Sequence, residues 1–530
     1  MKGAFKKRAR AVFLWGGAGL LIGLAALLAV FPEPARTQEE VASHIARYRE
    51  RVRTGYYEGY EVKPRELTSY DLMRNGIYEG NEVMPLNRSR DQARAPGIML
   101  SSILLSPTAA EVRIRSRLPD AHAGIKFYEQ STCIECHPRQ ARSVHTDRGG
   151  INCRQCHGPE PIPAINHYYS LMNPIRRHAY VCAKCHEGAN DLYAMYVVHE
   201  PPAGALTTLE SFPLLFYTSW GMLLLLVGTL AFFIPHSLMV GFRELFEKKK
   251  AHVKKIPTIY IKRFSKFQRV FHLFLMLTFL IQASTGLSRM FIITGWGEKL
   301  SNFFGGYETA YLIHCTGGVL MMLGFAVHII ILMTKIDRRN LIKSLFGPDS
   351  MIPTLQDAKH LWQRIRWFFG LGPPPKLDRW AYWEKFDYWA VFWGIPLLGG
   401  TGLMLMFPFL TSQILPGWTL NIAALLHRAE ALLAISYVFI VHFFIGHLRP
   451  LSFPMSEAMF SGSIPLEEVR EEKPAWVKRL TKEGKIELAR VNPPARWFRT
   501  LYFIFGYTAL GFGLYILING IYYSRYIRLH

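Results

Sequence analysis

Acidic residues are scarce in this sequence: 39 Asp and Glu stand against 62 Lys and Arg, which gives a formal net charge of +23. A charge of this size is also found in proteins that bind nucleic acid. Here, however, the Lys and Arg residues concentrate in segments that flank long apolar runs, which is the pattern of membrane proteins. We therefore exclude nucleic acid as a partner and expect a protein surrounded by membrane lipid.

Cysteine is equally scarce, and its placement is informative. The chain has seven Cys, and six of them form three copies of Cys-x-x-Cys-His, which leaves none for a disulfide framework. This motif is the attachment signature of c-type haem, in which two thiols add to the haem vinyl groups and the adjacent His ligates the iron. We expect three covalent haems, with thioether bonds from Cys133, Cys136, Cys153, Cys156, Cys182 and Cys185 and proximal ligands His137, His157 and His186.

Paired cysteines also build zinc sites, so the two interpretations must be compared. The first two pairs are separated by 16 residues, which fits a zinc ribbon. A ribbon uses pairs of pairs, however, and would leave the third pair without a role. Each second Cys is also followed directly by His, so we favour covalent haem. The seventh cysteine, Cys315, lies in an apolar run and is expected to be a buried thiol.

Hydrophobic residues make up 50% of the chain and gather into runs that are long enough to cross a bilayer, which takes about 20 residues. Seven such runs cover 11–31, 212–235, 270–292, 309–333, 387–408, 420–446 and 498–523. The first follows a basic start and has no clear small-residue cleavage site after it. We therefore interpret 1–31 as an uncleaved signal anchor rather than a cleaved signal peptide.

Loop charges predict the orientation of these spans. The segments after the second, fourth and sixth spans are rich in Lys and Arg, whereas 293–308 and 409–419 together carry one Lys and no Arg. The positive-inside rule places the basic segments in the cytoplasm and residues 32–211 outside. Bacterial c-type haem is attached outside the cytoplasmic membrane, so both arguments predict a multi-pass inner-membrane protein whose haem motifs lie in the periplasm.

The external region divides into a polar part, 32–120, which has no recognisable motif, and the haem-motif part, 121–200. Eighty residues around three large cofactors should form short helices and loops with little strand. Each iron needs a sixth ligand, usually His or Met. We expect His145, His178 and His199 in this role, with His122 and His167 as alternates and Met172 and Met195 as weaker candidates.

Ionisable side chains within spans are costly and usually functional. His314 and His328 are 14 residues apart on one predicted helix, and His427 and His442 are 15 apart on another. At 3.6 residues per turn each pair lies on one helix face, about 21 Å apart along the axis. The spacing predicts two b haems, an outer one on His314 and His427 and an inner one that uses His442. The partner of His442 is either His272 or His328.

Several of these motifs resemble a known family. Arg269-Val270-Phe271-His272, followed by Thr285-Gly286-Leu287, resembles the first span of the cytochrome b (gamma) subunits of formate dehydrogenase and of thiosulfate reductase-type enzymes. The segments that begin at Lys385-Phe386-Asp387-Tyr388-Trp389 and His427-Arg428-Ala429-Glu430 resemble the variant that is fused to a multihaem cytochrome c domain. The resemblance covers about 260–460.

That resemblance implies a four-helix dihaem core linked to a quinone, either menaquinone or ubiquinone. It implies His314 and His427 as ligands of the outer haem and His272 and His442 as ligands of the inner haem, and it leaves His328 without a role. The helical spacing favours His328 instead, so the choice stays open. Weak candidates for the quinone site are Arg269, His328 and His447.

We therefore expect a mostly α-helical, polytopic membrane bundle with a periplasmic triple-haem cytochrome c domain. The expected parts are an anchor, 1–31; a periplasmic region, 32–211; a span, 212–235; a cytochrome b-like domain, 260–460; a basic cytoplasmic segment, 461–497; and a last span, 498–530. Nothing resembles a nicotinamide, flavin or molybdenum site, so oxidation of a substrate would need a partner subunit.

The expected function is electron transfer between the quinone pool and a periplasmic redox protein or catalytic subunit, within a multi-subunit oxidoreductase complex. Two alternatives remain. One is a small-molecule reductase in which an open c haem binds an anion such as nitrite or sulfite. The other is a structural anchor of a larger complex whose haems act as passive wiring.

Overall fold

The computed structural model describes residues 133–524 except for 135–136, 141–142, 144, 147–150, 158–161, 163, 166–169, 175–176, 187, 249–258, 451 and 454. The expected anchor, residues 32–120, His122, Cys136 and His167 lie outside the described residues. The chain divides into two compact units. Within the described residues, the membrane unit covers 220–402 and 426–524, and the haem-motif unit covers 133–219 and 403–425.

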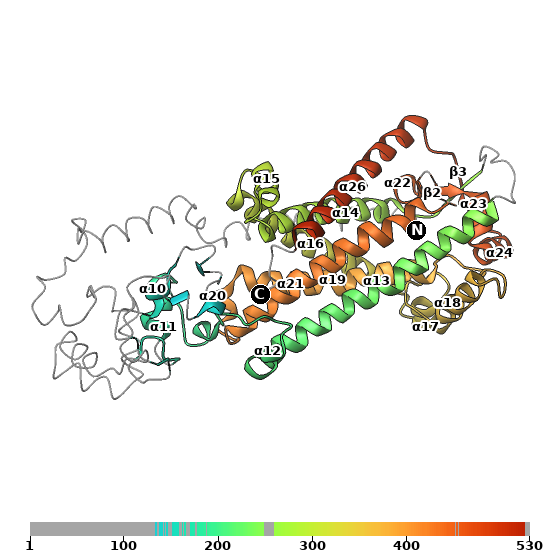
Figure 1. Cartoon of the computed structure of the whole chain (residues 1–530). Helices are drawn as coiled ribbons and strands as arrows, with labels where there is room; N and C mark the ends of the chain where they lie inside the picture. Colours follow the sequence, from blue (N-terminus) through green and yellow to red (C-terminus); the bar gives the residue numbers. More distant parts are fainter. Residues whose placement is uncertain are drawn as a thin grey trace, which may run out of the picture. The chain divides into compact units, whose positions relative to one another are not determined.

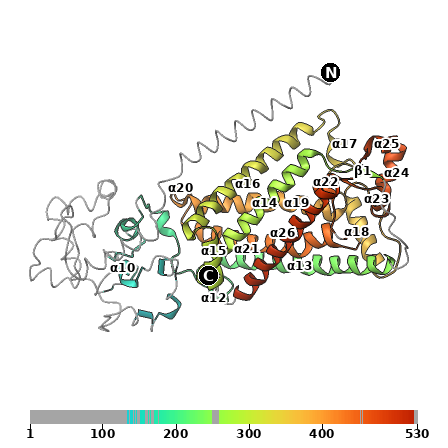
Figure 2. The ribbon, with the colours of Figure 1, turned by 90° about the horizontal axis from the view of Figure 1, so that it is seen from above.

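Six described helices are long and apolar enough to cross a membrane. They are α13 (Pro213–Lys248), α14 (Lys266–Met290), α16 (Tyr307–Lys335), α19 (Tyr382–Met406), α21 (Trp418–Tyr437) with its continuation to Leu448, and α26 (Arg496–Tyr523). Figure 1 and Figure 2 show most of them with their long axes roughly aligned. A mostly helical membrane bundle is therefore confirmed, and six of the seven predicted spans correspond to these helices.

The second predicted span is longer than expected. The apolar run in the sequence predicts a helix that ends at Pro235, but α13 continues through this proline to Lys248. Proline removes one backbone hydrogen bond, and helices in membranes tolerate this when neighbouring elements pack around the break. The segment after Pro235 supplies that packing, since Val240 is fully buried against Trp367 and Phe368.

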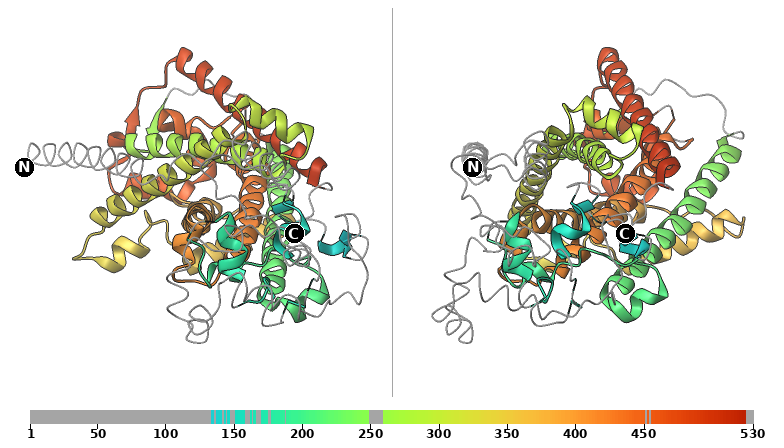
Figure 3. Two further views of the ribbon diagram at one scale, coloured as in Figure 1. Left: turned by 90° about the vertical axis from the view of Figure 1, so that its left-hand side faces the viewer. Right: turned by 60° about the vertical axis from the view of Figure 1, so that its left-hand side comes forward.

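The spanning helices pack through one large apolar cluster. Leu287 of α14 and Phe291, which follows the end of α14, meet Ile435 and Phe439 in α21 and its continuation, and Ile516 of α26 covers them. Seen roughly end-on in Figure 3, α14 and α16 lie beside each other and α26 lies at the edge of the bundle. Residues 295–303 form α15 (Gly295–Phe303), which joins α14 to α16 and contributes Trp296 and Leu300 to the same cluster.

One end of the bundle carries a small cap, which we define as residues 259–264, 349–381 and 455–491. Its sheet has the order β2-β1-β3, with β1 (Tyr260–Lys262) antiparallel to β2 (Ser463–Pro465) and β3 (Arg490–Val491). Its helices are α18 (Leu355–Phe368), α22 (Ala458–Ser461), α23 (Leu466–Glu472), α24 (Pro474–Lys482) and α25 (Ile486–Ala489). Between α16 and the cap residues that precede α19 lies α17 (Leu341–Phe346).

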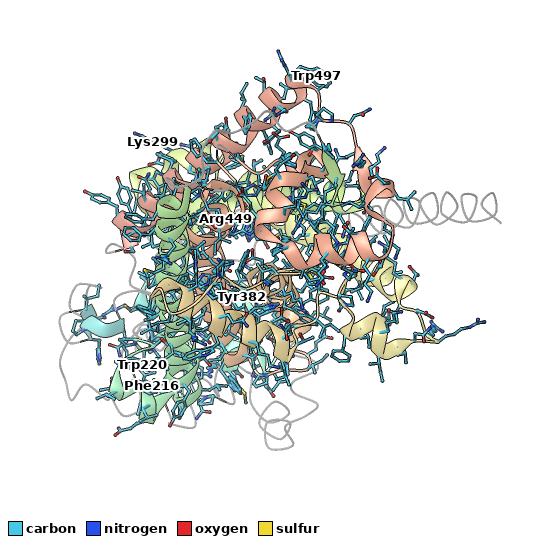
Figure 4. All side chains as sticks on the ribbon, turned by 90° about the vertical axis from the view of Figure 1, so that its right-hand side faces the viewer. Phe216, Trp220, Lys299, Tyr382, Arg449 and Trp497 are labelled. Carbon is cyan, nitrogen blue, oxygen red and sulfur yellow. The ribbon has the colours of Figure 1, made fainter. Side chains whose placement is uncertain are left out.

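Beneath the cap, Arg449 is the centre of a buried charge cluster. Its guanidinium contacts Glu244 at 3.3 Å and Glu472 at 2.5 Å. Burial alone would raise the pKa of the Glu472 carboxyl, but the charges of Arg449, Lys473 and Arg263 outweigh it and lower this pKa to about 2. Figure 4 looks onto this end of the bundle and shows Arg449 among the helices. Removal of Arg449 would leave buried carboxylates without their partner.

Glu468 on α23 carries a pH dependence of opposite sign. Burial and the nearby Glu472 carboxylate raise the pKa of Glu468 to about 7, above the value of about 4.3 for Glu in an unfolded chain. The folded state therefore favours the protonated carboxyl, and stability is lost as the pH rises from about 4.3 to about 7. We expect Glu468→Gln to raise the melting temperature of the purified protein at pH 8 and to leave it unchanged at pH 4.

The exposed neighbour Glu467 on the same helix provides the matched control for this measurement. Because an exposed carboxylate loses little hydration on folding, Glu467→Gln should change the melting temperature at pH 8 by much less than Glu468→Gln. Equal changes for Glu468→Gln at pH 4 and pH 8 would show that its effect does not come from ionisation.

Apart from the ends of α13, α19 and α21 that fall within it, the described part of the haem-motif unit consists of short helices and turns. They are η1 (Pro138–Gln140), α10 (Cys153–His157), α11 (Arg177–Tyr180), η2 (Cys182–Lys184), η3 (Tyr193–Met195), α12 (Leu206–Ser211) and α20 (Pro408–Thr411). Two of the three haem motifs thus fall at short helical turns. No strand occurs among the described residues of this unit, in agreement with the expectation from its size.

Candidate functional site

Two pairs of imidazole rings face each other between the spanning helices. We call His314 and His427 the outer pair and His272 and His442 the inner pair, after the predicted topology. The ring centres of the outer pair, on α16 and α21, are 6.1 Å apart with the ring planes at 72°. Those of the inner pair, on α14 and the continuation of α21, are 6.5 Å apart with the planes at 35°.

These separations fit a haem iron. An imidazole nitrogen binds a metal at about 2 Å, so two imidazoles on opposite sides of one iron have ring centres about 6 Å apart. Among the described residues, no three His, Cys, Asp or Glu side chains converge on a common metal position. Each pair therefore offers two axial ligands and no more, which suits an iron whose other four ligands come from a porphyrin.

The outer pair is held by two equivalent threonines. Thr285 of α14 lies 2.9 Å from Nδ1 of His314, and Thr401 of α19 lies 3.0 Å from Nδ1 of His427. Each Thr hydroxyl already donates its proton to a backbone carbonyl one turn earlier, at 2.7 Å and 2.6 Å. Each hydroxyl must therefore accept a hydrogen bond from the imidazole, which places the ring proton on Nδ1 and leaves Nε2 free to bind a metal.

A glycine follows each of these threonines and makes room for the ring. A Cβ atom at Gly286 would lie 3.1 Å from Cε1 of His314, and one at Gly402 would lie 3.3 Å from Cε1 of His427. Thr285-Gly286-Leu287 and Thr401-Gly402-Leu403 are thus two copies of one short motif with the same task. The second copy, and the role of both threonines, were missed from the sequence, although the repeated Thr-Gly-Leu was visible there.

The inner pair has a charged partner instead. Oδ2 of Asp387 on α19 accepts a hydrogen bond from Nδ1 of His442 at 2.9 Å, and its Oδ1 accepts one from the hydroxyl of Tyr437 at 2.6 Å. A ligating imidazole usually donates its second ring proton to a carboxylate, a carbonyl or water, which fixes the tautomer and the ring orientation. In the sequence, Asp387 belongs to a segment that resembles a known family, but nothing there predicts that it binds His442.

The backbone of α21 explains how His427 and His442 reach the same side of the bundle across 15 residues. After Tyr437 the helix continues as two π-helical turns, Val438–His442 and Phe444–Leu448. A π turn accommodates one inserted residue without rotating the remainder of the helix. Fifteen residues with one insertion behave as 14, which is about 1400° and within about 40° of four full turns.

His328, the alternative ligand, is not placed beside His442. Its ring stacks on Phe271 with centres 4.5 Å apart, and its Nε2 lies 3.0 Å from the hydroxyl of Tyr388. His328 lies on the same helix as His314, as the sequence predicts. However, the ring of Phe271 on α14 covers one face of the His328 ring. Between the two alternatives that the sequence left open, the structure brings His272 to His442.

The other residues named for a quinone site lie near the inner pair. The ring centre of His447 is 6.0 Å from that of His442. Arg269, three residues before His272 on α14, donates from Nε to the backbone oxygen of Phe460 at 2.7 Å. It also lines a cavity of about 520 Å³ together with Lys262, Phe264, Lys266, Ser461, Gly462, Ser463, Val491, Asn492, Pro494, Ala495, Trp497 and Phe498.

His236 on α13 is a membrane histidine that was not singled out in the sequence. It is buried, and its Nε2 is hydrogen-bonded to the hydroxyl of Tyr382. The rings of Phe233, Phe368 and Trp383 surround it. Among the described residues no second histidine ring packs against it, so His236 does not offer a paired metal site.

Among the described residues of the haem-motif unit, the histidines of the second and third motifs each lie beside another histidine ring. The rings of His157 and His199 are stacked at 24° with centres 6.4 Å apart, and those of His186 and His145 are 5.9 Å apart at 81°. His137 of the first motif is exposed. His178, also predicted as a sixth ligand, lies with Nδ1 2.8 Å from a carboxylate oxygen of Asp191.

The third haem motif lies against the segment 403–425 of the same unit. The ring of Phe409 is 6.0 Å from that of His186 and stacks on Tyr193 at 4.8 Å. Asn421 accepts from the backbone of Val197 at 3.1 Å and donates back to it at 3.0 Å. At Gly417 a Cβ atom would lie 2.5 Å from a backbone atom of Tyr193, so only glycine fits there.

Comparison with known proteins bears on the membrane unit. No curated protein matches the chain. Residues 263–462, which contain all four histidines of the outer and inner pairs, match the family described as Prokaryotic cytochrome b561, and this match is consistent with a membrane cytochrome b.

Proposed function

We propose that this protein carries electrons between a quinone and three covalent c-type haems by way of two b haems in the membrane. The observation that carries this proposal is the presence of two facing imidazole pairs in the region similar to prokaryotic cytochrome b561. Three Cys-x-x-Cys-His motifs in the same chain would hold the c-type haems that carry the electrons onward. Haem iron at these positions would alternate between its ferric and ferrous states.

In this proposal the four membrane histidines are axial ligands. His314 and His427 hold the outer b haem, and His272 and His442 hold the inner one. The α21 helix carries one ligand of each, about 20 Å apart along its axis at about 1.5 Å per residue. Thr285, Thr401 and Asp387 orient three of the imidazoles, while the haems themselves carry the electrons.

The facing rings also suggest sixth ligands for two c haems. His199 completes the haem on Cys153 and Cys156, and His145 completes the haem on Cys182 and Cys185. For the haem on Cys133 and Cys136, the sixth ligand comes from His178 or from His122 and His167, which lie outside the described residues. With the basic loops in the cytoplasm, these haems lie in the periplasm of a bacterial inner membrane and face a redox protein or a catalytic subunit of a larger complex.

The quinone is expected at the cavity beside Arg269. A volume of about 520 Å³ suits a ring-sized ligand, and the cavity combines aromatic side chains with hydroxyl and guanidinium donors that suit quinone oxygens. Arg269 and the inner ligand His272 are three residues apart on α14, so they are neighbours on the helix surface. This placement favours Arg269 over His328, whose open face is filled by Phe271.

The quinone site is tested by Arg269→Gln. We expect reduction of the b haems by a menaquinol analogue to slow at least tenfold, because a charge-assisted hydrogen bond to the quinone contributes about 1.5–3 kcal/mol. Reduction by dithionite should stay complete. Arg289, at the other end of α14 against Tyr307 and Tyr311, is the matched control, and Arg289→Gln should keep the wild-type rate of reduction by quinol.

Haem counting tests the proposal as a whole. A pyridine haemochrome spectrum of the purified protein should show two b haems and three c haems per chain. Failure of the wild-type protein to be reduced by a menaquinol analogue would reject the link to quinone. A high-spin c haem in the wild-type protein would instead favour the reductase alternative.

A further inference from the structure

We infer that Asp387 makes the two membrane haem sites unequal by giving the inner pair a lower reduction potential than the outer pair. This inference rests on the proposed function, because it takes each pair as the axial ligands of one b haem. Asp387 is then a positioning residue, since its carboxylate would reach the iron only through His442. The difference between the two sites follows from the hydrogen-bond partners of the ligands.

The outer pair has neutral hydrogen-bond acceptors. Thr285 and Thr401 accept from the two imidazoles through uncharged hydroxyls, which add little basicity to the rings. These hydroxyls therefore stabilise ferric iron less than a carboxylate acceptor would, which leaves the reduction potential of the outer site higher.

The inner pair has a charged hydrogen-bond acceptor. The carboxylate of Asp387 accepts the Nδ1 proton of His442, which makes the imidazole a more basic ligand. A basic ligand and a carboxylate bonded to it both stabilise ferric iron, so they lower the reduction potential. Asp387 also accepts from Tyr437, and two donors on one carboxyl group fit an ionised carboxylate that holds a fixed position. Asp387 is therefore expected to set the potential of the inner site below that of the outer site.

This order of potentials would favour electron transfer from the inner site to the outer site. With b haems bound by the two pairs, a quinol at the cytoplasmic end would release two protons and two electrons, one electron at a time. The site on His272 and His442 would pass each electron to the site on His314 and His427. The covalent haems would then carry it to a periplasmic acceptor.

The test is a redox titration of Asp387→Asn followed by optical absorption of the b haems. Asparagine keeps the size of the side chain but removes the charge. We expect the midpoint potential of the lower-potential b haem to rise, with at least a tenfold change in its reduction equilibrium, which is about 59 mV for one electron. The higher-potential haem should move much less, and Asp387→Glu should restore most of the wild-type difference.

Glu430 provides the matched control, because it is a second buried carboxyl among the spanning helices. Its carboxyl accepts from Trp393 at 3.2 Å, and it lies three residues after His427 on α21, on the side of the outer pair. Glu430→Gln should therefore leave the potential of the lower-potential haem unchanged. The inference is overturned if Asp387→Asn shifts the higher-potential haem, or shifts neither. A wild-type protein without two b haems would reject the proposed function instead, so the two failures are distinguishable.

Discussion

Replacing His442 with leucine is expected to remove one of the two b haems and to stop reduction of the c haems by quinol. His442 faces His272 at 6.5 Å and is anchored by Asp387, so its loss removes one axial ligand and the group that orients it. The haem would lose half of its attachment, because a b haem has no covalent bond to the protein. A pyridine haemochrome spectrum should then show one b haem and three c haems per chain.

His328→Leu is the matched control for this variant. His328 is also a membrane histidine, and the sequence alone offered it as the partner of His442. Its ring stacks on Phe271 and bonds to Tyr388, so leucine should leave both b haems in place and the rate of quinol oxidation near that of the wild type. If His328→Leu lost a b haem while His272→Leu kept both, the assignment of the inner pair would be wrong.

The comparison of His272 with His328 shows what helical periodicity can predict about a binding site and what it cannot. Hydropathy was sufficient for six spans, because an apolar run of about 20 residues has few alternatives to a membrane helix. Periodicity placed His314 and His328 on similar faces of one helix, but a face does not specify which neighbour it meets. Phe271 from α14 fills the space beside His328, and only the packing of two helices reveals this.

Residues that act through another side chain were harder to find. Thr285, Thr401 and Asp387 lie on helices other than those of the histidines they bond, and 26 to 55 residues separate the partners in sequence. No local pattern links such pairs. The extra residue between His427 and His442 was visible as an unusual spacing, but its cause, a π-helical turn, depends on backbone hydrogen bonds that the sequence does not display.

In the haem-motif unit the Cys-x-x-Cys-His motifs predict covalent haem from the sequence alone, because such attachment would require a fixed local spacing. The sixth ligands have no such constraint. His145, His178 and His199 are predicted from their positions along the chain near the motifs, and these positions do not say which iron each histidine would meet. The structure brings His145 to the third motif and His199 to the second, so chain order does not predict which iron each histidine meets.

Replacing His199 with alanine is therefore expected to convert one c haem, that on Cys153 and Cys156, from low spin to high spin. His199 stacks on the proximal His157 with ring centres 6.4 Å apart, and alanine cannot ligate iron. The ferric protein should gain a high-spin electron paramagnetic resonance signal that accounts for one of three c haems. The potential of this haem should rise, because a basic imidazole no longer stabilises the ferric state.

His145→Ala should do the same at the haem on Cys182 and Cys185, through the loss of the ring that faces His186. The effects of the two single variants on the number of high-spin haems should add, because each variant changes a different iron. The double variant should therefore carry two high-spin c haems. Met195→Leu is the control, since this thioether is 45% exposed and was only a weak candidate ligand. A single high-spin haem in the double variant would mean that both histidines ligate the same iron. The ring contacts seen in the structure would then not identify the sixth ligand of each haem.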